Sequence, residues 1–392
     1  MKKAGILLLS ALLTGAAALL IVGIRKHRTG VPVLCCTDSE MVFYQPLVER
    51  YEETRGAKIT LLSVDDDSYD PRKATGKADI VSVPVPAELM EAEQKRLFAD
   101  IGSALETDSF VLLPEGSNEN TGLFCLPISL DAPVILYNEK ILSDRGLSVE
   151  GKLQDITEAG LVLGEEGIVP FALARDADGR WDVGALTEGV LLAEVPETEE
   201  SGGLADGVYD LIVFANQIRP YMTEKGQAPG NIRELLSAFG QGELAITVVE
   251  LSELRLLPET DESWRIAPFT GTGLQYRAPC FPGRSLAISR KTGRRDAAED
   301  FLAFLVSEET QQFMYDMSGE LPAVGGIQVS ESLEPVYLLL SIPGGSRAAL
   351  FSCITAAQRE SCLTLVDSFF ETEQEAEAAE EQFRAVLHED GN

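Results

Sequence analysis

Apolar residues recur along the chain with the two spacings that distinguish buried strands from amphipathic helices. A short apolar run at 31–36 predicts a strand, and the stripe over 44–51, which ends before Gly56, predicts a helix. Further apolar runs at 58–64 and 79–83 predict two more strands. Because strands and helices alternate, this opening predicts a parallel sheet that is covered by helices.

The segment 283–323 carries the clearest local pattern in the chain. A strand-like run at 285–289 is followed by the stretch 296–305, whose apolar residues fall on one face of a helix. Ser307 is placed to cap a following helix, and Gly319 is placed to end it. The segment then closes on Leu-Pro-Ala, and this long ordered pattern is specific enough to compare with known families.

This order resembles the extracellular solute-binding proteins of ABC importers, in their maltose-binding-like class. Members of that class carry a glycine-bearing strand, a helix of the AxxFxxFL kind, a second helix and then G-x-LPA. The resemblance extends to the C-terminal helix and to the stretches 45–56, 78–81, 126–142 and 239–246. It therefore spans about residues 31 to 388.

The resemblance implies an α/β, two-lobed, periplasmic-binding-protein-like fold. Each lobe is expected to be a mostly parallel sheet flanked by helices, and the hinge is expected to have several crossings. The first lobe would comprise 31–130 plus 284–327, and the second 131–283 plus 328–392. The implied function is that of a monomeric ABC transporter component, which captures a small polar ligand, most often a sugar, in the cleft between the lobes. Closure of the lobes would present the ligand to the membrane permease.

Residues 1–30 indicate export. Lys2 and Lys3 precede the uncharged run 4–24, and a second basic cluster follows it. At about 1.5 Å per residue this run reaches roughly 30 Å, the thickness of a bilayer core. It is either an uncleaved membrane anchor or a cleaved signal peptide with 16–18 as the small-residue site. Both interpretations place the lobes outside the cytoplasm, and the first holds them at the cell membrane.

The net charge of −31 excludes one class of partner. The acidic excess lies entirely beyond residue 30, because 1–30 contain five Lys/Arg and no Asp/Glu. Binding to the phosphate backbone of nucleic acid requires a basic footprint, and none is visible. The charge therefore predicts a well-solvated surface, and nucleic acid is not an expected partner.

Few residues suit catalysis or metal binding. The histidines, His27 and His388, lie beside the N-terminal apolar run and at the C-terminus, so neither a Ser-His-Asp arrangement nor a two-histidine metal site is expected. The six cysteines form no CxxC pair, and buried free thiols are favoured although disulfides remain open. The acidic loop 65–70 lacks the order of an EF-hand. We therefore expect no catalytic residue, no cofactor and no metal.

Candidate ligand-binding residues follow from the resemblance. Asp131 occupies the hinge-proximal position where an acidic residue accepts hydrogen bonds from sugar hydroxyls, unless it forms a hinge salt bridge. Asp38 and Ser39 follow the first strand, at the edge where open α/β sheets bind ligands, unless they cap the next helix. Ser82 ends the third strand, where it lies at another cleft edge or is a neutral loop residue.

Three further residues complete this set. Trp181 lies where relatives carry an aromatic residue on the cleft face of the second lobe, so its ring either stacks on a sugar or packs in the core. Tyr276 and Arg284 flank the strand that returns through the hinge. Arg284 would place a cation near the cleft, either to favour an anionic group on the ligand or to pair with the acidic surface.

Two other functions remain open at this stage. Long sugar grooves use several aromatic platforms, whereas the chain contains only two Trp, so the fold could serve as a sensor or interaction module that has lost transport. A receptor needs converging donors and acceptors in its cleft, whereas such a module would have an apolar or filled cleft. A glycoside hydrolase needs only two carboxylates at a suitable spacing, and sequence cannot measure that spacing.

Overall fold

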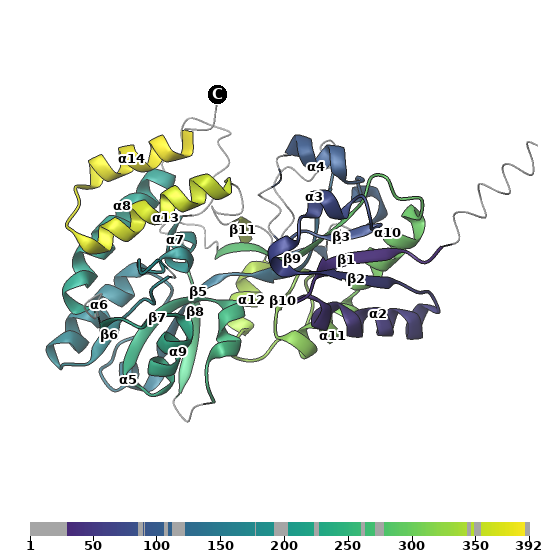
Figure 1. Ribbon diagram of the computed structural model, residues 1–392. Helices are drawn as coiled ribbons and strands as arrows, with labels where there is room; N and C mark the ends of the chain where they lie inside the picture. The colour runs from purple at the N-terminus through teal and green to yellow at the C-terminus, as the bar shows by residue number, and fades with distance from the viewer. Residues whose placement is uncertain are drawn as a thin grey trace, which may run out of the picture.

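The computed structural model describes residues 30–84, 89, 91–105, 109–111, 122–176, 178–191, 203–222, 227–259, 263–270, 278–342, 346–348 and 354–388. These residues form two lobes, each built on its own β-sheet with helices on its faces (Figure 1). The two-lobed α/β fold expected from the sequence is therefore confirmed. Two stretches expected to matter, the run 4–24 and Tyr276, lie outside the described residues.

The first lobe is built on a mixed sheet of β1 (Val33–Thr37), β2 (Thr60–Val64), β3 (Ile80–Ser82), β4 (Leu126–Asp131), β9 (Ala278–Ile288) and β10 (Leu321–Pro322). The strand order is β10-β4-β9-β3-β1-β2. β1 pairs in parallel with β2 and β3, whereas β9 is antiparallel to both of its neighbours, β3 and β4. β9 therefore joins the early strands to β4, although it comes from much later in the chain.

Helix α2 (Met41–Arg55) shows how the apolar spacing positions a helix of the first lobe. It buries Phe43, Tyr44, Leu47 and Tyr51 and ends at Gly56, whose φ of 66° is in the left-handed region that favours glycine. Tyr51 packs edge-on against a ring of the helix predicted at 296–305. The other helices of this lobe are α3 (Pro71–Ala74), α4 (Glu91–Leu97), α10 (Arg295–Leu305) and α11 (Glu308–Ser318).

The second lobe is built on a smaller sheet of β5 (Pro133–Asn138), β6 (Val169–Phe171), β7 (Leu244–Glu250) and β8 (Trp264–Pro268), in the order β6-β7-β5-β8. β6 is parallel to β7, and β5 is antiparallel to both β7 and β8. The helices around this sheet are α5 (Glu139–Ser143), α6 (Leu153–Glu165), α7 (Gly184–Val190), α8 (Gly203–Ile218) and α9 (Ile232–Gly240).

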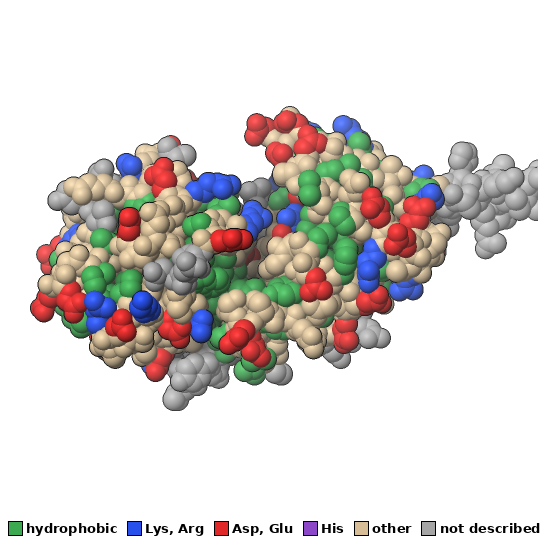
Figure 2. All heavy atoms as spheres, turned by 90° about the horizontal axis from the view of Figure 1, so that it is seen from below, with side chains coloured by type: hydrophobic (Ala, Val, Ile, Leu, Met, Phe, Trp, Pro, Cys, Tyr) green, Lys and Arg blue, Asp and Glu red, His purple; other side chains and the backbone are tan. Residues whose placement is uncertain are grey.

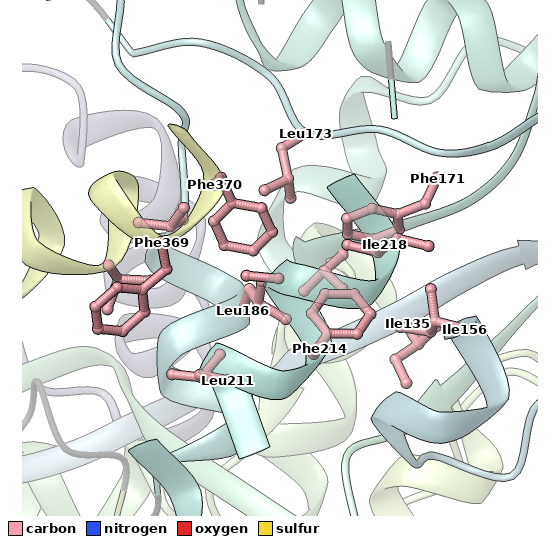
Figure 3. Packing of buried hydrophobic residues seen from close by; sticks show 14 of the residues in the cluster. Ile135, Ile156, Phe171, Leu173, Leu186, Leu211, Phe214, Ile218, Phe369 and Phe370 are labelled. Carbon is pink, nitrogen blue, oxygen red and sulfur yellow. The ribbon is translucent and has the colours of Figure 1, made fainter. Parts of the chain in front are cut away.

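The C-terminal helices α13 (Ala356–Glu371) and α14 (Ala376–His388) lie over α8 and complete the second lobe (Figure 1). Phe369 and Phe370 of α13 lie in the same hydrophobic core as Phe214 of α8 and Phe171 of β6 (Figure 3). The rings of Phe214 and Phe370 meet edge to face with their centres 6.3 Å apart. The end of the chain is thus a structural part of the second lobe.

The lobes are joined by short crossings and by a shared hydrophobic cluster. β4 ends at Asp131 and β5 begins at Pro133, so Ala132 alone separates the two sheets. A second connection runs from β8 to β9, and the start of β9 pairs with β11 (Ser346–Ala348). Helix α12 (Glu334–Ser341) buries Tyr337 in a cluster that includes residues of both sheets. The Tyr337 hydroxyl donates to the Val324 carbonyl at 2.6 Å, which fixes α12 to the chain that follows β10.

Two details differ from the sequence-based expectation. The sheets are mixed, not mostly parallel, because β9 and β10 in the first lobe and β5 in the second lobe run against the direction of the other strands of their sheet. Ser307 does occupy the N-cap position of α11, but its side chain makes no capping hydrogen bond there. Its hydroxyl instead donates to the Phe304 carbonyl at 2.7 Å, so it closes the preceding turn.

The described cysteines are all free and buried. Cys35 and Cys36 belong to different hydrophobic clusters, as expected for neighbours on one strand whose side chains point to opposite faces of the sheet. Burial raises the pKa of Cys36 and Cys125 to about 12, so both thiols are protonated and unreactive at neutral pH. Among the helices of the described residues, none has the length and apolar character needed to cross a membrane.

Candidate functional site

The carboxyl ends of the parallel strands lie toward the junction of the two lobes. In the first lobe β1 and β3 end at Thr37 and Ser82, and β3 runs antiparallel to β9, so its end faces the crossing from which β9 starts. In the second lobe β7 ends at Glu250, which pairs with Pro133, the first residue after the crossing at Ala132. Open α/β sheets bind ligands at such ends. The surface is indented between the lobes (Figure 2), so these two strand edges form the candidate binding site.

A charge network fixes the edge of the first lobe. Nε and Nη2 of Arg284 donate to the carboxylate of Glu320 at 2.7–2.9 Å, and Nη1 lies 3.7 Å from Oε1 of Glu40. The hydroxyl of Ser82 donates to Glu40 at 2.7 Å, and that of Ser129 donates to Glu320 at the same distance. The three charged side chains are 10–19% exposed. Five segments of the first lobe are therefore tied together at its cleft edge.

This network bears on the two interpretations of Arg284. Its guanidinium forms a bidentate ion pair and also lies 4.2 Å from the centre of the Phe43 ring, a cation–π contact. Most of its donors are thus occupied by protein groups. The geometry supports pairing with acidic residues, and it gives no support to a preference for an anionic ligand.

A pocket of about 210 Å³ opens beside this network. It is lined by Thr37, Asp66, Tyr69, Pro71, Arg72, Pro84 and Leu89. The hydroxyl of Ser39 donates to Oδ1 of Asp66 at 2.6 Å, and this hydrogen bond lowers the pKa of Asp66. The Tyr69 hydroxyl donates to the Ser82 carbonyl at 2.6 Å. The pocket therefore presents a carboxylate with a supporting hydroxyl at the carboxyl end of β1.

Asp38 and Ser39 lie at this edge, as the sequence predicts, and neither acts as the helix cap that was the alternative. The N-cap residue of α2 is Glu40, and its side chain forms no capping hydrogen bond at the start of this helix. Asp38 is exposed, and its backbone N–H donates to Val64 at 2.9 Å. Ser82 is fully buried and bonds to Glu40, so it supports the edge and is not a surface loop residue.

Asp131 lies at the crossing itself. It is 5% exposed, and its Oδ1 accepts hydrogen bonds from the backbone N–H groups of Ala132 at 2.8 Å and Ser252 at 3.2 Å. Burial raises its pKa, and the bonds from Ser252 and Ala132 partly oppose this shift. Within the described residues Asp131 forms no ion pair, so the hinge salt bridge that was its alternative role is not present there.

Four more carboxyl groups gather around Asp131 on the second lobe, and sequence reasoning missed them. They interact electrostatically with Asp131 or with one another, and we call the five residues together the second-lobe acidic cluster: Asp131, Asp182, Glu188, Glu250 and Glu253. They come from the end of β4, from α7 and the residues before it, from the end of β7, and from the turn after β7. A glutamate that ends an apolar strand, as Glu250 does in LAITVVE, is the sequence signal that marks this place.

Burial governs the charge of the second-lobe acidic cluster. Glu188 is 4% exposed, and its Oε2 has no hydrogen-bond partner. Burial raises the pKa of Glu188 to about 8 and that of Glu253 to about 7. The pKa of Glu250 is raised by burial and further by Asp131 and Glu188, while Arg359 of α13 opposes the shift. At neutral pH this edge thus holds several carboxyl groups that are protonated or close to titration.

Trp181 is placed in the core of the second lobe. It is 5% exposed, belongs to the same cluster as Phe171 and Leu186, and donates its backbone N–H to Oδ1 of Asp367 at 2.7 Å. This position favours the packing role over stacking on a ligand. The structure thus brings Asp38, Ser39, Ser82 and Arg284 together at the first-lobe edge and places Asp131 at the crossing, whereas Trp181 packs elsewhere.

Comparison with known proteins gives two kinds of match. Residues 37–312 match the family model of the bacterial extracellular solute-binding proteins. A curated relative, iron uptake protein A1 of Synechocystis sp. strain PCC 6803, is 22% identical over 299 residues, which cover 73% of this chain and 74% of the relative.

Solved structures match over nearly the whole chain. The apo form of RafE from Streptococcus pneumoniae is 16% identical, with a TM-score of 0.72 and coverage of 92% of this chain and 97% of RafE. The solute receptor AcbH, described as having an exclusive preference for β-D-galactopyranose, is 12% identical, with a TM-score of 0.71 and coverage of 91% and 99%. At these identities the structural likeness establishes the fold.

Proposed function

Because this chain belongs to the family of bacterial extracellular solute-binding proteins, we propose that it captures a small polar solute, with sugars as the first candidates, and delivers it to an ABC permease. The solute would bind between the first-lobe edge and the second-lobe acidic cluster. Movement of the two lobes about the crossing at Ala132 would then couple binding to recognition by the permease.

One observation carries this proposal, namely that the carboxyl ends of the strands of both lobes meet at the crossing and carry polar side chains. Asp38 and Asp66 lie at the first-lobe edge, and Asp131 and Glu250 lie at the second. A module that had lost ligand binding would be expected to have an apolar or filled cleft. The polar lining therefore supports a receptor over an interaction module.

The pocket volume and the carboxylates support a small, hydroxyl-rich ligand. A pocket of about 210 Å³ is smaller than the roughly 300–1,000 Å³ of sites for drug-sized molecules. Carboxylates accept short hydrogen bonds from hydroxyl groups, and Asp66 and Asp131 are placed to do so. The receptor AcbH, which shares this fold, is described as preferring a single sugar ring.

The cellular setting is part of the proposal. The family is extracellular, so the lobes lie outside the cytoplasm. We propose that 4–24 acts as the export signal and, if it is not cleaved, as the membrane anchor. The protein would act as a monomer whose first lobe contains 31–130 plus 284–327.

A thermal-shift screen against sugars, polyols, polyamines and organic anions tests the proposal. A ligand that binds only the folded protein, supplied at 100 times its Kd, should stabilise it by about 2.7 kcal/mol. The control is the Asp131→Asn variant, which should respond less to the same ligand while melting normally without it. Absence of a shift with every compound would refute small-solute capture, and release of a shorter sugar during incubation would indicate a glycoside hydrolase instead.

A further inference from the structure

Among the described residues, the two edges of the cleft offer exposed or unpaired carboxyl oxygens, and the cations at the first-lobe edge are paired with protein carboxylates. On the first lobe Asp38 and Asp66 are exposed, and Arg284 is already shared by Glu320 and Glu40. Arg72, which lines the pocket, is paired with Glu93. Asp131 and Glu250 of the second-lobe acidic cluster lie at the crossing, and its other three carboxyl groups interact electrostatically with them or with one another. The described cations that act on this cluster are Arg359 of α13 and Arg255, which lies next to Glu253 in the turn after β7.

From this arrangement we infer that the ligand of the cleft carries a positive charge, a protonated amine on a small polar skeleton, which binds against the second-lobe acidic cluster. An amino sugar and a short polyamine share this chemistry. The inference rests on the proposed function, because it specifies the class of solute that the same site captures.

Glu188 provides an observation that is independent of the number of carboxyl groups. It lies on α7, is 96% buried, and its Oε2 has no hydrogen-bond partner. Its carboxyl group interacts electrostatically with those of Asp131 and Glu250, and α7 packs against β5 and β7, the strands that begin and end at this edge. A buried carboxyl oxygen without a partner is costly, and an ammonium group supplies both the missing hydrogen bonds and the opposite charge.

A neutral sugar would satisfy this cluster less well than an amine. Hydroxyl groups can donate hydrogen bonds to these carboxyl groups, but they carry no charge that would stabilise the ionised forms of Asp131, Glu188 and Glu250. One ammonium group carries three donors and one full charge. In the low-dielectric surroundings of these buried groups that charge is screened less than it would be on the surface.

The geometry favours an organic cation over a metal ion. Among the described residues no group of three or more His, Cys, Asp or Glu side chains is arranged to hold a metal ion. The carboxyl groups of the cluster are instead spread over four segments of the second lobe and the crossing. Such a spread suits a ligand with several atoms of its own between its polar groups.

Protonation of the cluster adds a testable consequence. Burial raises the pKa of Glu188 to about 8, and the groups that interact electrostatically with it are Asp131 from β4, Glu250 from β7 and Arg359 from α13. A bound ammonium group would lower this pKa, so binding would release protons at neutral pH. The affinity for a cation should therefore rise as the pH increases from 6 toward 9.

Calorimetric titration of the full-length protein tests the inference with matched probes. Glucosamine is compared with glucose, which differs by the amine, and spermidine is the polyamine arm. We expect at least one amine to bind tenfold or more tightly than glucose, and we expect its affinity to fall at high salt. The pH series uses spermidine, whose amines stay protonated over most of the range, and protons released are counted by repeating the titration in a second buffer.

Two variants locate the interaction. Glu188→Gln keeps the shape of the side chain and should weaken binding of the amine about tenfold to a hundredfold. Glu243→Gln is the control, because exposed Glu243 lies at the opposite end of β7 from Glu250, about 23 Å away at 3.3 Å per residue. This control should bind like the wild type.

The outcomes separate this inference from the proposed function. Tighter binding of glucose than of both amines, or equal binding of amines by Glu188→Gln and wild type, would overturn the inference and leave sugar capture intact. If neither amine binds, the inference is overturned as well, and the neutral compounds of the thermal-shift screen then decide the proposed function separately.

Discussion

Glutamates line both edges of the cleft, but the two sets have different partners. At the first-lobe edge Glu40 and Glu320 share the guanidinium of Arg284 and accept hydrogen bonds from two serines. At the second-lobe edge Glu188 is buried and Glu250 is half-buried among other carboxyl groups, and Glu188 leaves one oxygen unpaired.

The comparison shows that residue type alone does not determine charge. The carboxyl groups of the first-lobe edge are paired with a cation, whereas a carboxyl group that is buried beside other carboxyl groups is driven toward its neutral form. The first-lobe edge therefore acts as a fixed structural network. The second-lobe acidic cluster instead contains carboxyl groups whose protonation a ligand can change.

Loss of the cation at the first-lobe edge should have the largest effect. We expect Arg284→Met to lower the free energy of unfolding by about 3 kcal/mol or more, because it leaves Glu320 and Glu40 without their shared partner. Urea unfolding measures this change. The control is Arg384→Met, which removes an exposed helix-surface ion pair and should cost less than about 0.5 kcal/mol. Equal losses in the two variants would mean that the first-lobe glutamates do not need the cation.

Replacement of Glu188 at the second-lobe edge should instead raise the free energy of unfolding. The pKa of Glu188 is raised to about 8, so the contribution of its neutral form to stability is present below about pH 4.5 and is lost as the pH rises toward 8. Glu188→Gln lacks this loss and should be more stable than the wild type at pH 7, by at most about 3 kcal/mol. The unfolding free energies of the two proteins should converge near pH 4.5. Urea unfolding from pH 4.5 to 8 measures this, and a difference between the proteins that does not change with pH would contradict the assignment.

Asp131→Asn tests the residue at the crossing, where the two edges meet. The amide oxygen of Asn can accept the same bonds from Ala132 and Ser252, so the melting temperature should change little. Loss of the charge should weaken binding of a polar ligand by about 1.5–3 kcal/mol, or roughly tenfold to a hundredfold. Calorimetric titration with a ligand from the screen measures this, and wild-type affinity would assign Asp131 a structural role.

A single hydrogen bond at the first-lobe edge should give the smallest effect. Ser82→Ala removes the donor to Glu40 and should cost about 1–2 kcal/mol of stability, since the acceptor is buried and ion-paired. Exposed Ser143 provides the control, because Ser143→Ala should be close to neutral. If Ser82→Ala were also neutral, the first-lobe network would be as loosely held as the second-lobe acidic cluster.

The sequence allowed the fold to be predicted well because its signals are local or belong to long ordered motifs. The stripe of α2, the stop at Gly56 and the pattern of α10 each depend on spacing within one element. Strand direction depends on how the chain passes between lobes, which spacing within an element does not encode. This is why a mostly parallel sheet was expected and a mixed one is found.

The candidate site could be predicted only in part. Asp38, Ser39, Ser82 and Asp131 end or follow strands, so position in the pattern was enough to find them. Glu188 lies within a helix of the second lobe, and its environment is set by strands far away in sequence. Trp181 shows the reverse problem, since an aromatic residue near a cleft position carries no signal that separates packing from stacking.

The place of β9 in the first-lobe sheet has a consequence for the order in which the protein matures. β9 lies between β4 and β3, yet the chain completes the whole β5–β8 sheet of the other lobe before it reaches Ala278. Until then β3 and β4 expose unpaired edges, which are prone to pair with other chains. The part of the protein that is synthesised first is therefore the last to close its sheet. An export pathway that threads an unfolded chain would receive the first lobe before it can fold.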